Sequence, residues 1–80
     1  AKPEEATKWI LRQLYYRQKE YQAATGEFAA TATALKASDI CSAEQVAKMT
    51  VERTASLFEI SLPAADGSVW RINQDGFVWK

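Results

Sequence analysis

The spacing of apolar residues differs between the two halves of the chain. In the first half, which is rich in helix-forming Ala, Gln, Glu and Lys, apolar side chains recur at three- and four-residue steps. Pro3 suits the first helical position, and Gly26 can adopt the left-handed conformation that ends a helix. We therefore predict a long helix over residues 3–25. Its predicted apolar stripe consists of Ala6, Ile10, Leu14 and Tyr21, with Trp9 and Arg17 beside it.

Two short helical segments are predicted between the long helix and the second half of the chain. One covers residues 31–36, with Leu35 as its apolar anchor. Further along, Ser42 and Gln45 have the spacing of a capping box, in which each side chain bonds to the backbone N–H of the other residue. This spacing predicts a helical turn over residues 43–48.

The last third of the chain has the pattern of short strands. It is rich in Val, Ile, Phe, Trp and Thr, and apolar and polar residues alternate along it. Pro63 and Asp66-Gly67 mark a break between two such runs. The segment Asn73-Gln74-Asp75-Gly76 is typical of a type I turn followed by a left-handed glycine. Strands are predicted over residues 57–62, 69–72 and 77–79, with residues 50–54 as a candidate fourth.

The last hairpin predicts which side chains share a face of the sheet. A three-residue loop at 74–76 places Arg71 opposite Trp79 and Ile72 opposite Val78, and side chains alternate between faces along each strand. The face with Ile72 is apolar and is assigned to the core. A four-residue loop would instead turn the side chains of the last strand to the opposite faces. The exposed strip then consists of Val69, Arg71, Phe77 and Trp79.

Together these elements predict an α+β domain. A long N-terminal helix lies across a small antiparallel sheet of three or four strands, with one or two short helices between them. Residues 1–80 are enough for one domain, and a chain that begins Ala-Lys-Pro suggests a piece processed or excised from a larger protein. The predicted core consists of Ile10, Leu14, Tyr21, Phe28, Leu35, Phe58, Ile60, Leu62, Trp70, Ile72 and Val78.

The composition argues against an enzyme, a cofactor or a metal site. Histidine is absent, which excludes Ser-His-Asp and Cys-His arrangements and His-ligated zinc. The single cysteine, Cys41, is better explained as a small apolar residue than as a reactive thiol. A glycosidase needs two carboxylates across a cleft, which a chain of 80 residues would struggle to form. The carboxylates considered are Glu27, Glu44, Glu52, Glu59, Asp66 and Asp75, of which the last two precede glycines and fit turns.

The charge pattern argues against nucleic acid and membrane partners. Ten basic and ten acidic residues are interspersed and give no net charge, so no basic footprint is available to neutralise phosphates. No run approaches the ~18 consecutive apolar residues of a membrane-spanning helix. We therefore expect neither nucleic acid binding nor direct membrane insertion.

The aromatic residues carry the sharpest binding signal. The chain has three each of Trp, Tyr and Phe, and exposed rings can stack on sugars or anchor a protein partner, although most rings in a small domain form its core. Tyr16 lies on the side of the helix away from Leu14, which favours exposure. Trp79 is placed to form a cation–π pair with Arg71. The candidate binding residues are Val69, Arg71, Phe77, Trp79 and Tyr16.

Two family resemblances arise from the same segments. The first pattern comprises Tyr15-Tyr16-Arg17-Gln18, Tyr21, Gly26, Phe28 and Leu35. It resembles the helix-to-loop passage of type IV pilins and pseudopilins, in which a glycine ends the helix and an aromatic residue follows. The long apolar helix start of the pilins and their methylated N-terminal Phe segment are missing, so filament assembly is not carried over.

The second pattern comprises Pro3-Glu4-Glu5, Trp9, Leu11-Arg12-Gln13, Tyr15-Tyr16, Gln18, Tyr21 and Gly26, and then Trp70-Arg71-Ile72, Gln74-Asp75-Gly76 and Trp79-Lys80. It resembles the C-terminal tail domain of bacterial carbohydrate-binding family 9-like proteins, which follows a sugar-binding β-sandwich. That sandwich is absent here, so its sugar-contacting residues have no counterparts. The resemblance implies an extracytoplasmic bacterial origin, periplasmic or secreted, and a pilin-like helix-on-sheet fold.

Three hypotheses for function follow. The first is a non-catalytic accessory domain that packs on a neighbouring domain or protein partner through the exposed strip, which would need an apolar patch. The second is direct carbohydrate binding, with Trp79 and Tyr16 as stacking rings, which would need exposed, roughly coplanar rings beside polar groups. The third is a pilin-like subunit that self-associates along its helix.

Overall fold

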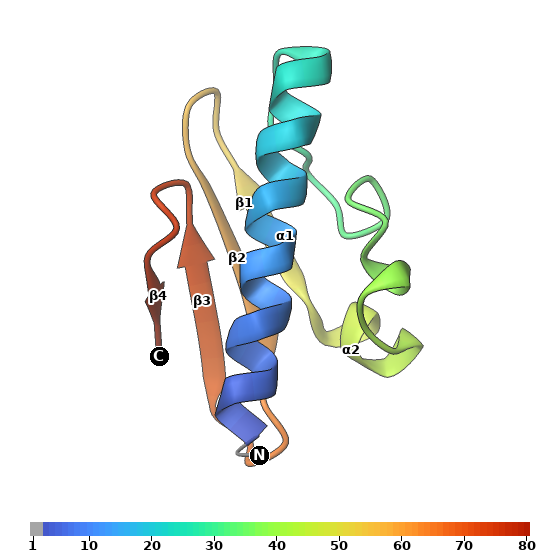
Figure 1. Cartoon of the computed structure of the whole chain (residues 1–80), viewed down its shortest axis with the longest axis vertical. Coiled ribbons are helices and arrows are strands. Elements are labelled where there is room, and N and C mark those ends of the chain that lie inside the picture. The colour runs from blue at the N-terminus through green and yellow to red at the C-terminus, as the bar shows by residue number, and fades with distance from the viewer. Residues whose placement is uncertain (1–2) are drawn as a thin grey trace.

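The computed structural model describes residues 3–80, with side chains described from residue 5 onward. A long helix lies across one face of a four-stranded antiparallel sheet with strand order β1-β2-β3-β4 (Figure 1). The predicted α+β architecture is therefore confirmed, including the fourth strand. The elements are α1 (Pro3–Thr25), a 3₁₀ helix η1 (Ala37–Asp39), α2 (Ala43–Lys48), β1 (Thr50–Arg53), β2 (Phe58–Pro63), β3 (Val69–Asn73) and β4 (Val78–Trp79).

Helix α1 packs on the sheet through a face that the apolar pattern does not identify. Thr7, Leu11, Leu14 and Gln18 are buried, and their four-three-four spacing places them on one side of a helix. Two of these four residues are polar, which conceals the stripe from a search for apolar periodicity. Of the predicted stripe, only Leu14 is fully buried; Ile10, Tyr21 and Arg17 are half-buried, whereas Ala6 and Trp9 are exposed, so their prediction was wrong.

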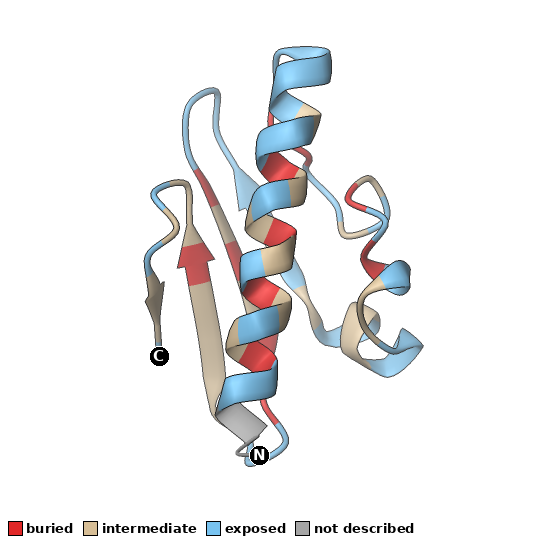
Figure 2. Ribbon diagram, viewed as in Figure 1, coloured by how far each residue is buried: buried red, intermediate tan, exposed pale blue. Residues whose placement is uncertain are grey.

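The core lies between α1 and the sheet (Figure 2). The predicted core residues of the strands are buried there, except that Trp70 and Val78 are only partly buried. Leu11 and three alanines were missed. Leu11 lies outside the predicted stripe of α1, and the alanines are buried only where the tertiary structure brings another segment over them. The buried apolar residues are Leu11, Leu14, Phe28, Ala29, Leu35, Ala37, Phe58, Ile60, Leu62, Ala64 and Ile72.

The segment between α1 and α2 departs from the predicted helix over residues 31–36. Successive turns occupy it, and Lys36 has a φ of 55°, a left-handed conformation that interrupts a right-handed helix. Leu35 is buried as predicted. The Arg17 guanidinium donates hydrogen bonds to the carbonyl oxygens of Leu35 and Lys36 at 3.2 and 2.9 Å, which ties this segment to α1.

The ends of the other elements follow local rules. Gly26 has a φ of 86° immediately after α1. Both hydrogen bonds of the predicted capping box are present, since Gln45 N–H donates to the Ser42 hydroxyl and Ser42 N–H donates to the Gln45 side chain. These two helix boundaries were predictable because the residues that set them are close together in the sequence.

The last hairpin has the predicted register. Arg71 pairs with Trp79 and Ile72 pairs with Val78. Gly76, at a φ of 76°, follows the turn, and the Asn73 side-chain oxygen accepts hydrogen bonds from the backbone N–H groups of Asp75 and Phe77. The loop therefore holds three residues, and the last strand keeps the predicted orientation.

Gly76→Ala is expected to destabilise the domain by about 1–2 kcal/mol, because a side chain is strained at positive φ. A Cβ atom here would also lie 3.4 Å from the Tyr15 ring. Gly67→Ala is the matched control, since Gly67 has a φ of 89° but open space around it. Urea unfolding should show the larger loss for Gly76→Ala; equal losses would mean that the Tyr15 contact adds nothing.

Candidate functional site

The face of the sheet that points away from α1 is open. The helices of the described chain pack on the other face, where Val46 and Met49 of the α2 region also meet the core. Paired residues of antiparallel strands share a face, so the strand register defines this surface. The open face consists of Thr50, Glu52, Glu59, Ser61, Pro63, Val69, Arg71, Asn73, Phe77 and Trp79.

A groove of about 340 Å³ lies at the end of the open face formed by the β1–β2 and β3–β4 turns. Glu59 and Asn73 are paired across β2 and β3 beside it, and Trp79 bounds it from the edge strand. The turn residues Thr54 and Leu57 bound it on the side of β1 and β2. Its lining residues are Glu52, Arg53, Thr54, Leu57, Phe58, Glu59, Asn73, Gln74 and Trp79.

The groove carries charges of both signs, because Arg53, Glu52 and Glu59 line it and Arg71 lies beside it. Glu52 and Glu59 are directly paired across β1 and β2, so two carboxylates are neighbours on the open face. Arg71 Nε lies 3.6 Å from Glu59 Oε2, and their side chains are 38% and 43% exposed, so this ion pair is open to solvent and contributes little to stability. The groove can therefore offer both hydrogen-bond acceptors and donors to a ligand.

The aromatic residues of the open face lie next to each other but are not coplanar. The ring centroids of Phe77 and Trp79 are 5.9 Å apart, with 41° between the ring planes. Phe77 is 62% exposed and does not line the groove, whereas Trp79 is half-buried and does. One ring, rather than a platform of two, is thus available to a ligand in the groove.

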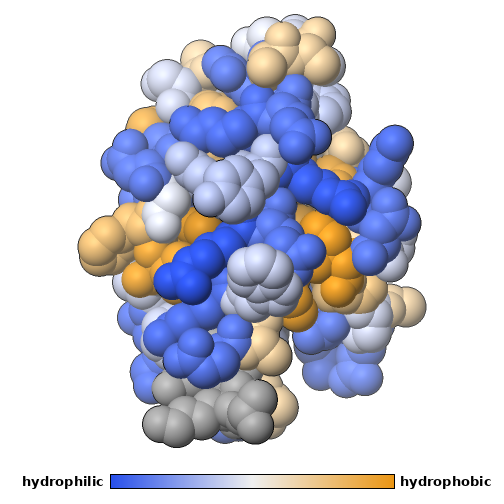
Figure 3. Space-filling model, in the orientation of Figure 1, coloured by the Kyte–Doolittle hydropathy of each residue, from blue (hydrophilic) through white to orange (hydrophobic). Residues whose placement is uncertain are grey.

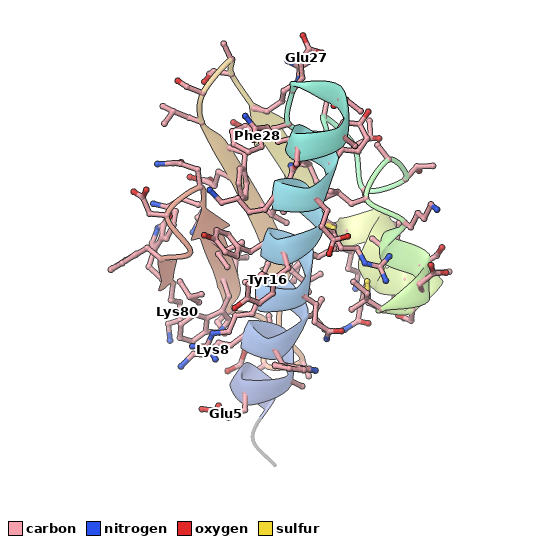
Figure 4. The ribbon with its side chains drawn as sticks, turned by 45° about the horizontal axis from the view of Figure 1, so that its top comes forward. Glu5, Lys8, Tyr16, Glu27, Phe28 and Lys80 are labelled. Atoms are coloured by element: carbon pink, nitrogen blue, oxygen red, sulfur yellow. The ribbon has the colours of Figure 1, made fainter. Side chains whose placement is uncertain are left out.

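The structure brings four of the five candidate residues to one surface. Val69, Arg71, Phe77 and Trp79 all belong to the open face, although Val69 pairs with Pro63 at the end away from the groove. Tyr16 lies on the opposite layer, on the side of α1 that faces away from the strands (Figure 4). Tyr16 and Trp79 therefore cannot contact the same ligand molecule as one platform.

The predicted cation–π pair between Arg71 and Trp79 is not formed. Arg71 is instead directed toward Glu59, which lies on β2 two residues from Ser61, the direct pairing partner of Arg71. Cation–π contacts occur on the α1 side of the molecule, where Lys8 Nζ lies 4.5 Å from the centroid of the Trp70 ring. The prediction failed because it considered only the β3–β4 pair and not β2.

The sequence did not single out the polar lining of the groove as a site. Glu52 and Glu59 were considered only as carboxylates, and Asn73 and Gln74 only as turn residues. The missing information was the pairing of β1 with β2, which places Glu52 beside Glu59. Alternation within each strand could have assigned the faces, but not this register.

The other carboxylates and the cysteine have local roles. The Asp66 carboxylate accepts hydrogen bonds from the hydroxyl and the backbone N–H of Ser68, which lower the pKa of Asp66. Glu44 pairs with Lys48 along α2. The half-buried Cys41 thiol donates to the Ala37 carbonyl at 3.2 Å, and burial raises its pKa. A raised pKa disfavours the nucleophilic thiolate.

The described chain was also searched for metal sites and membrane-spanning helices. No group of three or more Cys, Asp or Glu side chains between residues 5 and 80 is placed to hold a metal ion. Within the described part of the chain, no helix has the length and apolar character needed to cross a membrane.

The chain was compared with protein-family models, with curated proteins and with solved structures, and no match was found in any of the three. The resemblances drawn from residue patterns therefore stay predictions.

Proposed function

We propose that this chain is a non-catalytic accessory domain that binds carbohydrate through the groove on the open face of its sheet. It would serve an extracytoplasmic bacterial protein, in keeping with the family resemblance. The observation that carries the proposal is the position of Trp79 beside two carboxylates and two amide side chains in one groove.

The chemistry of a sugar matches this combination of groups. A pyranose ring has an apolar C–H face that packs on an aromatic ring, and its hydroxyl groups both donate and accept hydrogen bonds. Carboxylates accept such bonds, while amides and arginines donate them. The groove, at about 340 Å³, lies at the small end of the size range of ligand sites, which suits one or two sugar units.

The composition of the open face favours a sugar over a docked protein domain. A docking domain was expected to carry an apolar patch without a groove, but Thr50, Glu52, Glu59, Ser61 and Asn73 make this surface polar. The tilt between Phe77 and Trp79 departs from the coplanar rings expected for sugar binding. The proposal therefore rests on Trp79 alone as the stacking ring.

Trp79→Ala is expected to weaken binding of the best oligosaccharide about tenfold or more, because it removes the central aromatic contact. The domain would be titrated with neutral β-linked oligosaccharides and followed by amide chemical shifts in NMR. Saturable shifts should cluster at Trp79, Glu59 and Asn73. Tyr16→Ala removes an exposed aromatic ring from the opposite layer, outside the groove, and is the control.

Two results would contradict the proposal. One is equal affinity in the Trp79→Ala variant, with folding verified by circular dichroism. The other is the absence of any shift across the panel for the folded domain, which would favour the accessory domain that docks on a neighbouring domain. Glu52→Gln provides a second check, because it alters one carboxylate of the groove without removing buried surface.

A further inference from the structure

The outward side of α1 carries two exposed aromatic residues in line. Trp9 and Tyr16 are 62% and 64% exposed, and they are seven residues apart, which is close to two turns of helix. A single exposed ring needs no explanation, but two aligned rings mark a candidate contact surface. Ala23 follows at the same spacing and is also exposed. We call this side the outer helix face: Trp9, Arg12, Gln13, Tyr16, Lys19, Glu20 and Ala23.

The two flanks of the outer helix face differ in charge. On one flank lie Arg12 and Lys19, and Lys19 Nζ is 5.4 Å from the ring of Tyr15, which contacts Gly76 in the β3–β4 turn. This flank therefore faces the hairpin. The other flank carries Gln13 and Glu20.

The flank with Glu20 faces the loop that follows α1, because Glu20 lines a hollow with Arg17, Lys36 and Asp39, of which Arg17 and Asp39 form an ion pair. Among the described residues, Arg12, Lys19 and Glu20 form no ion pair within 4.0 Å. Their charges are thus available to a partner.

We propose that the outer helix face pairs with the same face of a second copy of this chain, with the two helices parallel about a two-fold axis. Such an axis exchanges the flanks, so Lys19 of one copy lies against Glu20 of the other, and Arg12 lies against Gln13. An antiparallel pair keeps like flanks together and places Arg12 beside Lys19 of the second copy. Charge complementarity therefore selects the parallel arrangement.

The same arrangement aligns the residues in the middle of the face. Trp9 meets Trp9, Tyr16 meets Tyr16 and Ala23 meets Ala23, at the seven-residue repeat that lets two helices stay in contact along their length. The alanine lets the helices approach closely near the end of α1. All three residues are exposed, so no other segment of the described chain covers them.

The contact is expected to be weak. The surface over α1 is mostly hydrophilic, with near-neutral groups between charged ones and apolar groups only at its sides (Figure 3). A small, polar interface of this kind gives a concentration-dependent dimer rather than an obligate one. The pairing leaves both open faces on the outside, pointing away from each other. If those faces bind carbohydrate as proposed, the dimer is bivalent, and its avidity exceeds that of one site.

Sedimentation equilibrium of the folded domain tests the pairing without any ligand. The average mass should rise toward twice the monomer mass between about 10 µM and about 1 mM. The Trp9→Ser/Tyr16→Ser double variant should stay monomeric over that range. Phe77→Ser is the matched control, since Phe77 is exposed to the same extent as Trp9 but lies on the open face. A monomer at every concentration, or association unaffected by the double variant, would overturn the proposal.

Charge variants test the parallel arrangement. Lys19→Glu places like charges together in a parallel pair and should weaken dimerisation, whereas it would relieve the clash with Arg12 in an antiparallel pair. Adding Glu20→Lys should restore dimerisation, because residues 19 and 20 of the two copies then again carry opposite charges. Ala23→Cys in a Cys41→Ser background should form a disulfide between copies only if the helices are parallel. Stronger association in Lys19→Glu would overturn the parallel arrangement. A failure of the domain to bind sugar would contradict the proposed function but not the pairing of the helices.

Discussion

Gln18→Leu is expected to cost about 3–5 kcal/mol of unfolding free energy, because it leaves two buried backbone groups without partners. Gln18 is fully buried, its Nε2 donates to the Ala29 carbonyl at 2.9 Å, and the Ala29 N–H donates to its Oε1 at 2.7 Å. A domain of this size has a total stability of roughly 4–12 kcal/mol. The variant should therefore lose a large fraction of its stability, seen as a lower urea midpoint by circular dichroism.

The neighbouring turn of the same helix supplies the control. Gln22→Leu changes the same residue type four positions on, where the side chain is exposed, and should change stability by less than about 0.5 kcal/mol. Equal, small losses of unfolding free energy in both variants would contradict this role. The two hydrogen bonds between Gln18 and Ala29 would then not be what holds the segment after α1 to the helix.

Gln18→Glu should make the stability of the domain depend on pH, because a carboxyl group then takes the place of the amide that bonds to the Ala29 backbone. A carboxyl group can accept from the Ala29 N–H in either state, but it can donate to the Ala29 carbonyl only when protonated. Protonation is thus favoured in the folded state, and the variant should be most stable at acid pH and lose stability as the pH rises through the titration of that carboxyl group. A variant that became more stable toward neutral pH would contradict this geometry.

Ile60→Ala should lower the free energy of unfolding by about 2–5 kcal/mol, because it opens a cavity in the middle of the core. Ile60 is fully buried on the central strand β2, between Val51 on β1 and Ile72 on β3. The loss should appear as a lower urea midpoint with an unchanged slope.

Ser61→Ala is the matched control for the core variant, since the next residue along β2 points to the open face. It should stay within about 0.5 kcal/mol of the parent chain. A large loss in Ser61→Ala would mean that the open face is packed against something, and the proposed groove would then be unavailable to a ligand.

The sequence alone determined most of the elements and several of their ends, although not the segment over residues 31–36. The limits of α1, the capping box at Ser42 and the three-residue loop before Phe77 were all predictable. Each depends on residues within a few positions of one another, so the physical causes, which are capping hydrogen bonds, turn geometry and side-chain alternation, are complete in a short segment. The division of the last hairpin into a core face and an exposed strip followed from the same local rules.

The tertiary structure decided which side of α1 is buried and which residues of different elements become neighbours. The buried stripe of α1 includes Thr7 and Gln18, and Gln18 is buried only because the Ala29 backbone comes back to meet it. Likewise, Glu52 becomes part of a groove through the pairing of β1 with β2, and Tyr16 is separated from Trp79 by the packing of α1 on the sheet. Burial and proximity depend on contacts between residues far apart in the chain, and periodicity within one segment carries no information about what lies opposite it.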